Sequence, residues 1–282
     1  MINGISFEFF PPNSIEMEQK LKQSIGNLIT LNPNFVSITY GAGGSTRNKT
    51  HKIVSKLISQ TNLNVAAHLT CVNSSKDEIN DVINNYLAIG VKHIVALRGD
   101  MKGHQKFIPH SDGCKNSIEL IKLIKKKGDF KISVSGYPER HPESLGLKSD
   151  IDFLKEKIDA GADQIITQFS LKTENYLKYR DELVNAGVNV PIIPGIMLIK
   201  SFSGIQNMSK KIGIEVTDFI RQTVADNHSK EKQMNISEKF ATEQSRELEA
   251  DGIENLHFYT LNDSKIMIKV ANELGFENSI KN

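Results

Sequence analysis

The chain has 282 residues, 39% of them hydrophobic and 24% charged, and its 35 Lys and Arg side chains nearly balance its 33 Asp and Glu side chains. These values are typical of a globular protein with a large core, and near-neutrality gives no reason to expect nucleic acid or an anionic membrane as a partner. Two cysteines are too few for a disulfide framework, and the sequence has neither an apolar run of about 18 residues nor a secretory signal pattern. We therefore expect a soluble cytoplasmic protein.

Eight short segments rich in Val, Ile, Phe and Tyr recur at similar intervals along the chain. They are residues 5–10, 35–40, 65–71, 93–98, 131–137, 164–169, 191–197 and 256–261. Most of them are apolar at both odd and even positions, which is typical of parallel strands that are buried on both faces.

Segments with apolar residues at three- and four-residue steps separate these strands, as in residues 17–28. Several of them end in a glycine, which can close a helix before the next strand begins. Only the interval 202–253 is longer than one helix needs. There we expect two helices, near 216–224 and 238–249, joined by a polar loop at 226–232.

Eight β-then-α units in a chain of this length predict an α/β fold, a (β/α)8 barrel of the TIM type that forms a single domain. The alternative is an open, doubly wound sheet, but no G-x-G-x-x-G turn follows an early strand to support it. In such a barrel the chemistry lies at the C-terminal ends of the strands. Polar residues at those ends are therefore the candidates for a site.

The first strand carries one such residue, Glu8, between Phe7 and Phe9. A carboxyl group among aromatic residues on a buried strand is costly to ionise, so we expect its pKa to be raised. A carboxylic acid that stays neutral near pH 7 can serve as a general acid. The alternative is a structural glutamate in an ion pair.

Further polar groups follow the next strands. The small residues of 39–46 would let a ligand approach the backbone closely, and His68 is either a hydrogen-bonded core histidine or a catalyst. Arg98 offers a planar donor fork for a phosphate or a ring carbonyl, unless it pairs with Asp100 at the barrel mouth. Gln168 lies in an apolar strand and must be either networked or directed toward a ligand.

A compact polar cluster at 137–143 follows the fifth strand. The sequence shows no set of His, Cys and carboxylate residues with zinc spacing, no G-x-S-x-G motif and no Walker loop, so we expect no metal site. Polar groups on successive strand ends therefore indicate an α/β-barrel enzyme that binds a large, partly polar organic ligand.

Eight motifs then carry a resemblance to a known family, in order and over nearly the whole chain. They are FEFFPP at 7–12, TYGAGGS at 39–45, HLTC at 68–71, LRGD at 97–100, YPERHPE at 137–143, ITQF at 166–169, PGI at 194–196 and HFYTLN at 257–262. Together these motifs resemble the bacterial 5,10-methylenetetrahydrofolate reductase family. The resemblance implies one catalytic barrel domain over residues 1–282, without the regulatory domain of the eukaryotic enzymes.

The resemblance implies a barrel that contains FAD and reduces methylenetetrahydrofolate to 5-methyltetrahydrofolate with NADH or NADPH, in one-carbon metabolism and methionine biosynthesis. Reduced nicotinamide would pass hydride to the flavin and leave before the folate takes its place, which is a ping-pong reaction. Glu8 matches the general acid of the family, Asp100 matches a carboxylate that contacts both flavin and pterin, and Gln168 matches a residue that hydrogen-bonds the substrate. Members of the family are commonly homo-oligomers.

The resemblance also assigns ligand contacts. For FAD they are Thr39, Tyr40, Ala42, His68, Arg98, Gly99, Asp100, Tyr137, His141, Asp150 and Lys157. For the folate substrate they are Glu8, Asp100, Gln168 and Gln206. Two alternatives stay open, namely a flavin-binding relative that acts on another pterin or electron partner, and a folate-binding barrel without redox chemistry.

The departures from the family pattern lie on the substrate side. The arginine that usually follows Asn262 is Asp263 here, and its carboxylate would repel the acidic glutamate tail of folate or lose a contact. A usual glutamine and a usual aromatic residue fall on Gly204 and Met208, where Gln206 could substitute if the loop shifts. We expect these changes to affect folate affinity or the preference for polyglutamates and to leave flavin binding unchanged.

Overall fold

A computed structural model describes residues 1–41, 46–101, 106–225 and 227–276. Within these residues a single sheet runs in the order β7-β6-β5-β4-β3-β2-β1-β9-β8, and every pair of neighbouring strands is parallel. The strands are β1 (Gly4–Phe9), β2 (Phe35–Ile38), β3 (Val65–Thr70), β4 (His93–Leu97), β5 (Lys131–Gly136), β6 (Gln164–Thr167), β7 (Ile192–Ile193), β8 (Gly195–Met197) and β9 (Asn255–Tyr259).

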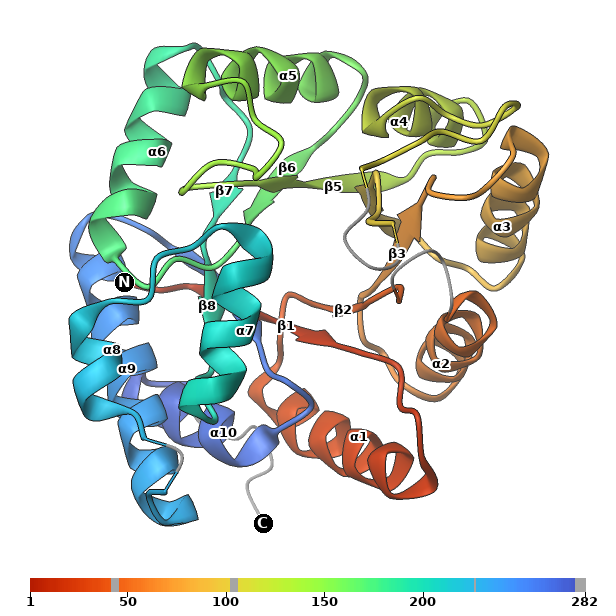
Figure 1. The fold of residues 1–282 in the computed structure, drawn as a ribbon. Coiled ribbons are helices and arrows are strands. Elements are labelled where there is room, and N and C mark those ends of the chain that lie inside the picture. The colour runs from red at the N-terminus through yellow and green to blue at the C-terminus, as the bar shows by residue number, and fades with distance from the viewer. Residues whose placement is uncertain (42–45, 102–105, 226, 277–282) are drawn as a thin grey trace.

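The two shortest strands, β7 and β8, are halves of one segment that is interrupted at Pro194. β7 pairs with β6 on one side and β8 pairs with β9 on the other, so the segment joins the two edges of the sheet. Proline has no N–H to donate to a ladder, but its carbonyl still accepts from the His257 N–H at 2.9 Å. The sheet therefore closes into a barrel with eight strand positions (Figure 1), which confirms the predicted (β/α)8 fold.

Helices surround this barrel on the outside, and the main hydrophobic core lies between them and the outward face of the strands (Figure 1). They are α1 (Ile15–Leu28), α2 (Arg47–Gln60), α3 (Lys76–Ala88), α4 (Ser117–Lys125), α5 (Leu147–Asp159), α6 (Thr173–Asn185), α7 (Phe202–Ile212), α8 (Asp218–Thr223), α9 (Lys230–Ala250) and α10 (Ser264–Glu273), with a short 3-10 helix, η1 (Ile29–Leu31), after α1. None of the helices in the described ranges has the length and apolar character needed to cross a bilayer.

The interval after the seventh strand position differs from the prediction, because it holds three helices rather than two. α7 was not expected; it begins after Ser201, whose hydroxyl accepts from the Gly204 N–H, and ends at Gly213 in the left-handed conformation. α9 begins at Lys230, well before the expected start, because the Ser229 hydroxyl caps its first turn. Part of the predicted polar loop is therefore helix.

The interior of the barrel holds a mixed aromatic and polar cluster. Phe35 on β2 lies 5.4 Å from the His257 ring on β9 and 4.9 Å from the His93 ring on β4, measured between ring centroids. Neither of those strands neighbours β2 in the sheet, so these contacts cross the interior. The Ser6 hydroxyl lies 2.8 Å from Nδ1 of His257 and gives this ring a polar partner.

Candidate active site

A cavity of about 390 Å³ lies at the C-terminal ends of β4 and β5, beside the start of α4 and along α5. It brings together most of the residues that the sequence assigns to a flavin cofactor. These are Arg98, Gly99, Asp100, Tyr137, His141, Asp150 and Lys157. The lining also includes Lys115 and Asn116 at the start of α4.

The most buried charged residue in the lining of this cavity is Lys157 on α5, which is only 7% exposed. Its ammonium donates to the carbonyl oxygen of Ser135 at 3.3 Å, and burial lowers its pKa to about 8, an effect that Asp150 opposes and Arg98 increases. One carboxylate oxygen of Asp150, Oδ2, is buried without a hydrogen-bond partner among the described residues. A buried ammonium and an unpartnered carboxylate oxygen suit a ligand that has both phosphate and hydroxyl groups.

Arg98 has a different partner from the one considered above. Its guanidinium makes an ion pair with Glu143 at 2.5 Å, not with Asp100, and it lies over the Phe107 ring at 4.8 Å. The Glu143 carboxylate is 43% exposed, so this pair contributes little to stability and leaves the guanidinium available to a ligand.

Gly99 next to Arg98 has a φ of +83°, and a Cβ there would lie 2.6 Å from Cγ1 of Val72. The position therefore needs glycine to let the chain pass the segment after β3, whether or not a ligand binds.

Two aromatic rings form one wall of the cavity. The Tyr137 and His141 rings meet edge to face, with their centroids 4.8 Å apart. Burial raises the pKa of Tyr137, while burial and the nearby Arg98 lower the pKa of His141. Both rings are therefore neutral near pH 7, as a surface that packs against a flat ring should be.

Glu8 and His68 form a second group inside the mouth, outside the lining of this cavity. Oε2 of Glu8 on β1 lies 3.5 Å from Nε2 of His68 on β3. Burial raises the pKa of Glu8 to about 8 and lowers the pKa of His68 to about 3. Near pH 7 both groups are thus largely neutral, and their contact is not an ion pair. The sequence analysis predicts a raised pKa for Glu8, and the structure agrees.

Gln168 and Tyr259 lie at the ends of β6 and β9. The Tyr259 hydroxyl, on the residue in register with Glu8, donates to the carbonyl oxygen of Thr167 at 2.8 Å. The Gln168 side chain accepts from the Phe169 N–H at 3.0 Å. In the described residues no hydrogen bond or ion pair joins Glu8, Asp100 and Gln168, so the three predicted catalytic groups come from separate strand ends without touching.

The predicted contacts after β2 lie outside the cavity lining. Thr39 and Tyr40 are half-buried, and the Thr39 carbonyl accepts from the Thr50 hydroxyl at 2.8 Å. Ala42 lies outside the described residues. The structure thus does not join this turn to the cavity, and the predicted flavin contacts of Thr39, Tyr40, Ala42 and His68 stay predictions.

Helix α7 carries the positions that depart from the family pattern. Gly204 and Met208 are half-buried and four residues apart, so they share one helix face, whereas Gln206 is exposed. A residue two positions along a helix does not face the same direction. The structure therefore does not bring Gln206 to the place where a substitute for Gly204 would have to lie.

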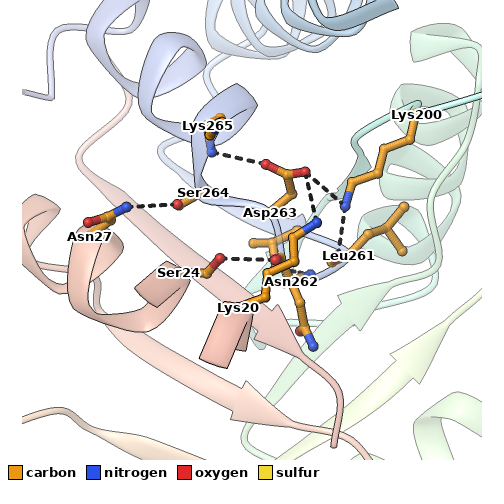
Figure 2. Close-up of polar contacts among 10 residues, drawn as sticks. Lys20, Ser24, Asn27, Lys200, Leu261, Asn262, Asp263, Ser264 and Lys265 are labelled. Atoms are coloured by element: carbon orange, nitrogen blue, oxygen red, sulfur yellow. Dashed lines mark hydrogen bonds and ion pairs between the residues drawn. The ribbon is translucent and has the colours of Figure 1, made fainter. Parts of the chain in front are cut away.

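Asp263, which the sequence analysis expects to repel the folate tail or to lose a contact with it, has several polar partners in the structure. It caps the start of α10, where Oδ1 accepts from the Lys265 N–H, and Oδ2 lies 3.4 Å from Nζ of Lys20 and 3.3 Å from Nζ of Lys200 (Figure 2). Burial acts to raise the pKa of Asp263, but Lys200 and Lys20 hold it below its usual range. Its charge is therefore offset by two lysines that the sequence analysis did not single out.

The interior histidines His93 and His257 were also missed. Their signal is in the sequence, because polar residues such as Ser6 and Ser133 occupy alternate, inward-facing positions of otherwise apolar strands. Across the described ranges, no group of three or more His, Cys, Asp and Glu side chains could hold a metal ion.

The chain matches the family described as methylenetetrahydrofolate reductase over residues 3–275. It is 38% identical over 276 residues to the 5,10-methylenetetrahydrofolate reductases of Pectobacterium carotovorum subsp. carotovorum and Escherichia coli (strain K12), covering 96% of this chain and 90% of each relative. A Clostridium thermocellum protein described as binding two copies of 5-methyl-5,6,7,8-tetrahydrofolic acid has a similar fold, with a TM-score of 0.64, 17% identity and coverage of 96% and 94%. The match in sequence spans nearly the whole barrel, and the chain belongs to the methylenetetrahydrofolate reductase family.

Proposed function

We propose that the chain reduces 5,10-methylenetetrahydrofolate to 5-methyltetrahydrofolate, with FAD as its cofactor and NADH or NADPH as the electron source. The observation that carries this proposal is the cavity at the ends of β4 and β5, where most residues assigned to a flavin converge in a chain of this family. Flavin, when bound, would accept hydride from the nicotinamide and deliver it to the folate.

The cavity residues fit FAD by their chemistry. Lys157 is a buried cation that would bind the pyrophosphate, and Oδ2 of Asp150 would accept a hydrogen bond from a ribose hydroxyl. Arg98 supplies donors for a ring carbonyl or phosphate, and the neutral rings of Tyr137 and His141 offer a flat wall. Lys157 and Arg98 each have one acceptor and Oδ2 of Asp150 has no partner among the described residues, so all three can bind a polar ligand.

Glu8 is the proposed proton donor to the folate. Because its pKa is about 8, it carries a proton near pH 7 and can transfer it to a ring nitrogen of the substrate, which opens the five-membered ring. His68, neutral at 3.5 Å, adds no charge that would ionise the acid. Asp100 at the mouth would stabilise the positive charge that develops on the opened substrate, and Gln168 would hold the pterin by its amide.

A second candidate is a flavin-dependent relative that acts on another pterin. The observation that favours it is the pair Gly204 and Met208 on α7, which removes a polar and an aromatic contact expected on the substrate side. The cofactor residues are the same in both cases, so only the oxidising substrate separates the two.

The test follows each half of the reaction in turn. The purified protein, reconstituted with FAD, is reduced anaerobically with NADH or NADPH, and the flavin absorption is followed after methylenetetrahydrofolate is added. We expect rapid return of the oxidised spectrum together with 5-methyltetrahydrofolate. A flavin that is reduced but stays bleached would favour the second candidate, and failure to bind FAD would refute both.

A further inference from the structure

The loop after β5 carries a carboxylate that the proposed reaction does not use, that of Glu139. Among the described residues, the lining of the cavity at the ends of β4 and β5 includes Tyr137 and His141, which flank Glu139 in sequence, but not Glu139 itself. The side chain of Glu139 is therefore directed elsewhere, although the loop around it forms the aromatic wall of the cavity. We call residues 137–143 the wall loop.

Both oxygens of the Glu139 carboxylate accept hydrogen bonds from outside the wall loop. Oε1 accepts from the Ser170 hydroxyl at 2.6 Å, and Oε2 accepts from the Glu215 N–H at 3.2 Å. Ser170 follows β6, two residues after Gln168, and Glu215 lies between α7 and α8. One side chain thus joins the wall loop to two segments that are distant from it in sequence.

Apolar packing fixes the two segments that Glu139 binds. The residues on either side of Ser170 and of Glu215 are buried in one apolar cluster that also contains residues of α7 and α8. They are Phe169, Leu171, Ile214 and Val216. No residue of the wall loop is as fully buried as these four, so the loop is the more easily displaced partner. The carboxylate therefore restrains the loop against fixed points.

The backbone of the wall loop needs such a restraint. Arg140, next to Glu139, has a φ of +69°, in the left-handed region that is unfavourable for a residue with a long side chain. Its N–H donates to the Tyr137 carbonyl at 3.1 Å and closes a tight turn. A Cβ at Gly213 would lie 3.7 Å from Cγ of Pro142, so the loop also lies against the end of α7. A residue in this region persists where surrounding contacts impose it, and the hydrogen bonds of Glu139 are such contacts.

We propose that Glu139 is a positioning residue that holds the wall loop in the conformation in which Tyr137 and His141 face the cavity; its effect on flavin binding rests on the proposed function. Glu139 acts through its two hydrogen bonds rather than through its charge. Without them the wall loop samples other conformations. The apparent dissociation constant for the cofactor then rises in inverse proportion to the population of the binding conformation.

The test measures FAD affinity by fluorescence titration and the hydrogen exchange of the amides in and next to the wall loop. Glu139→Ala removes both hydrogen bonds, so we expect roughly tenfold weaker FAD binding and roughly tenfold faster exchange of the Arg140 and Ser144 N–H groups. Glu139→Gln should keep both values close to those of the unmodified protein, because its amide oxygen can accept from the Glu215 N–H while its amide nitrogen donates to the Ser170 oxygen. The control is Glu215→Ala, which removes an exposed carboxylate but keeps the N–H that Glu139 binds, and it should change neither value.

The outcomes separate this proposal from the proposed function. If the unmodified protein binds FAD, an unchanged affinity or an unchanged exchange rate in Glu139→Ala refutes the positioning role. A Gln variant as impaired as the Ala variant refutes it too, because the charge would then matter rather than the hydrogen bonds. If the unmodified protein does not bind FAD, the reductase proposal fails, and hydrogen exchange still decides whether Glu139 holds the loop.

Two further measurements distinguish this role from general stabilisation of the fold. Exchange of the amides in α2 and α3 should be the same in all variants, and faster exchange throughout the chain in Glu139→Ala would overturn the proposal. Ser170→Ala removes only one of the two hydrogen bonds and should shift FAD affinity and loop exchange in the same direction by a smaller factor. It therefore decides the question if Glu139→Ala does not fold.

Discussion

The protonation of Glu8 is set by burial rather than by a charged neighbour. Desolvation raises its pKa to about 8, and His68, which its carboxylate contacts, is itself neutral. The flanking Phe7 and Phe9 are buried in the outer core, on the opposite face of β1. The sequence argument thus reached the right pKa direction through the wrong neighbours, because it could not see that Glu8 points into the barrel.

Replacing this acid should separate the two halves of the reaction. We expect Glu8→Gln to lower the rate of folate reduction by about 10²-fold or more, since glutamine cannot donate the proton. Reduction of the flavin by nicotinamide should persist, because that step needs no proton from Glu8. Stopped-flow absorption measures both steps. The reverse result, with nicotinamide oxidation lost and folate reduction retained, would contradict the assigned role.

The same residue sets two pH dependences. In the unmodified protein the folate step should fall as pH rises through about 8, where Glu8 loses its proton. The folded state holds this proton between pH 4.5 and 8 while the unfolded chain does not, so the free energy of unfolding should decline across that window. Glu8→Gln should abolish this part of the decline in urea unfolding.

One face of helix α5 lines the cavity at the C-terminal ends of β4 and β5. Asp150, Leu154 and Lys157 follow one another at steps of four and three residues, so they project to the same side of the helix. This spacing was readable from the sequence, and the family resemblance named both charged residues. What the sequence could not reveal is that the Lys157 ammonium is buried with the Ser135 carbonyl as its partner.

The buried Lys157 on α5 should lower the stability of the protein without FAD and raise its affinity for FAD. We expect Lys157→Met to raise the free energy of unfolding without FAD by about 1–3 kcal/mol, because a desolvated cation is replaced by an apolar group of similar length. FAD affinity should fall roughly 10- to 100-fold, since a charged hydrogen bond to phosphate is lost. Urea unfolding and fluorescence titration measure the two effects.

Lys148→Met, an exposed position on the same helix, is the matched control and should change neither quantity appreciably. The dependence of stability on pH should also differ between the unmodified protein and Lys157→Met. The lowered pKa of Lys157 makes the unmodified protein gain stability as pH rises from about 8 to 10.5, and the variant should lack this gain. Equal loss of stability in the two variants would contradict the buried-cation account.

At the scale of the whole molecule, closure of the barrel decides which residues meet. The eight strands were predictable because each is a short apolar run followed by a helical stretch. The grouping of Lys20 and Lys200 around Asp263 was not predictable, because Lys20 lies near one end of the chain and Lys200 follows the seventh strand position. The Phe35 contacts with His93 and His257 were hidden for the same reason, since they join strands that are not neighbours.

The barrel closes at β8, and there is no room for a side chain at Gly195 in that strand. We call this place the seam. A Cβ at Gly195 would overlap the Thr167 carbonyl oxygen and the Tyr259 ring, which belong to strands on both sides of the seam. We therefore expect Gly195→Ala to lower the free energy of unfolding by about 2–3 kcal/mol, because the backbone of β6 cannot move freely and the half-buried Tyr259 ring is held by its hydrogen bond to the Thr167 carbonyl.

The matched control for the seam is Gly26→Ala in α1, where a Cβ meets nothing within 4 Å. Alanine is the better helix former, so this variant should gain up to about 1 kcal/mol. The two substitutions add the same methyl group, and urea unfolding should give them opposite signs. A neutral result at Gly195 would mean that the strands separate at β8 without cost, and that the barrel is not held closed through this segment.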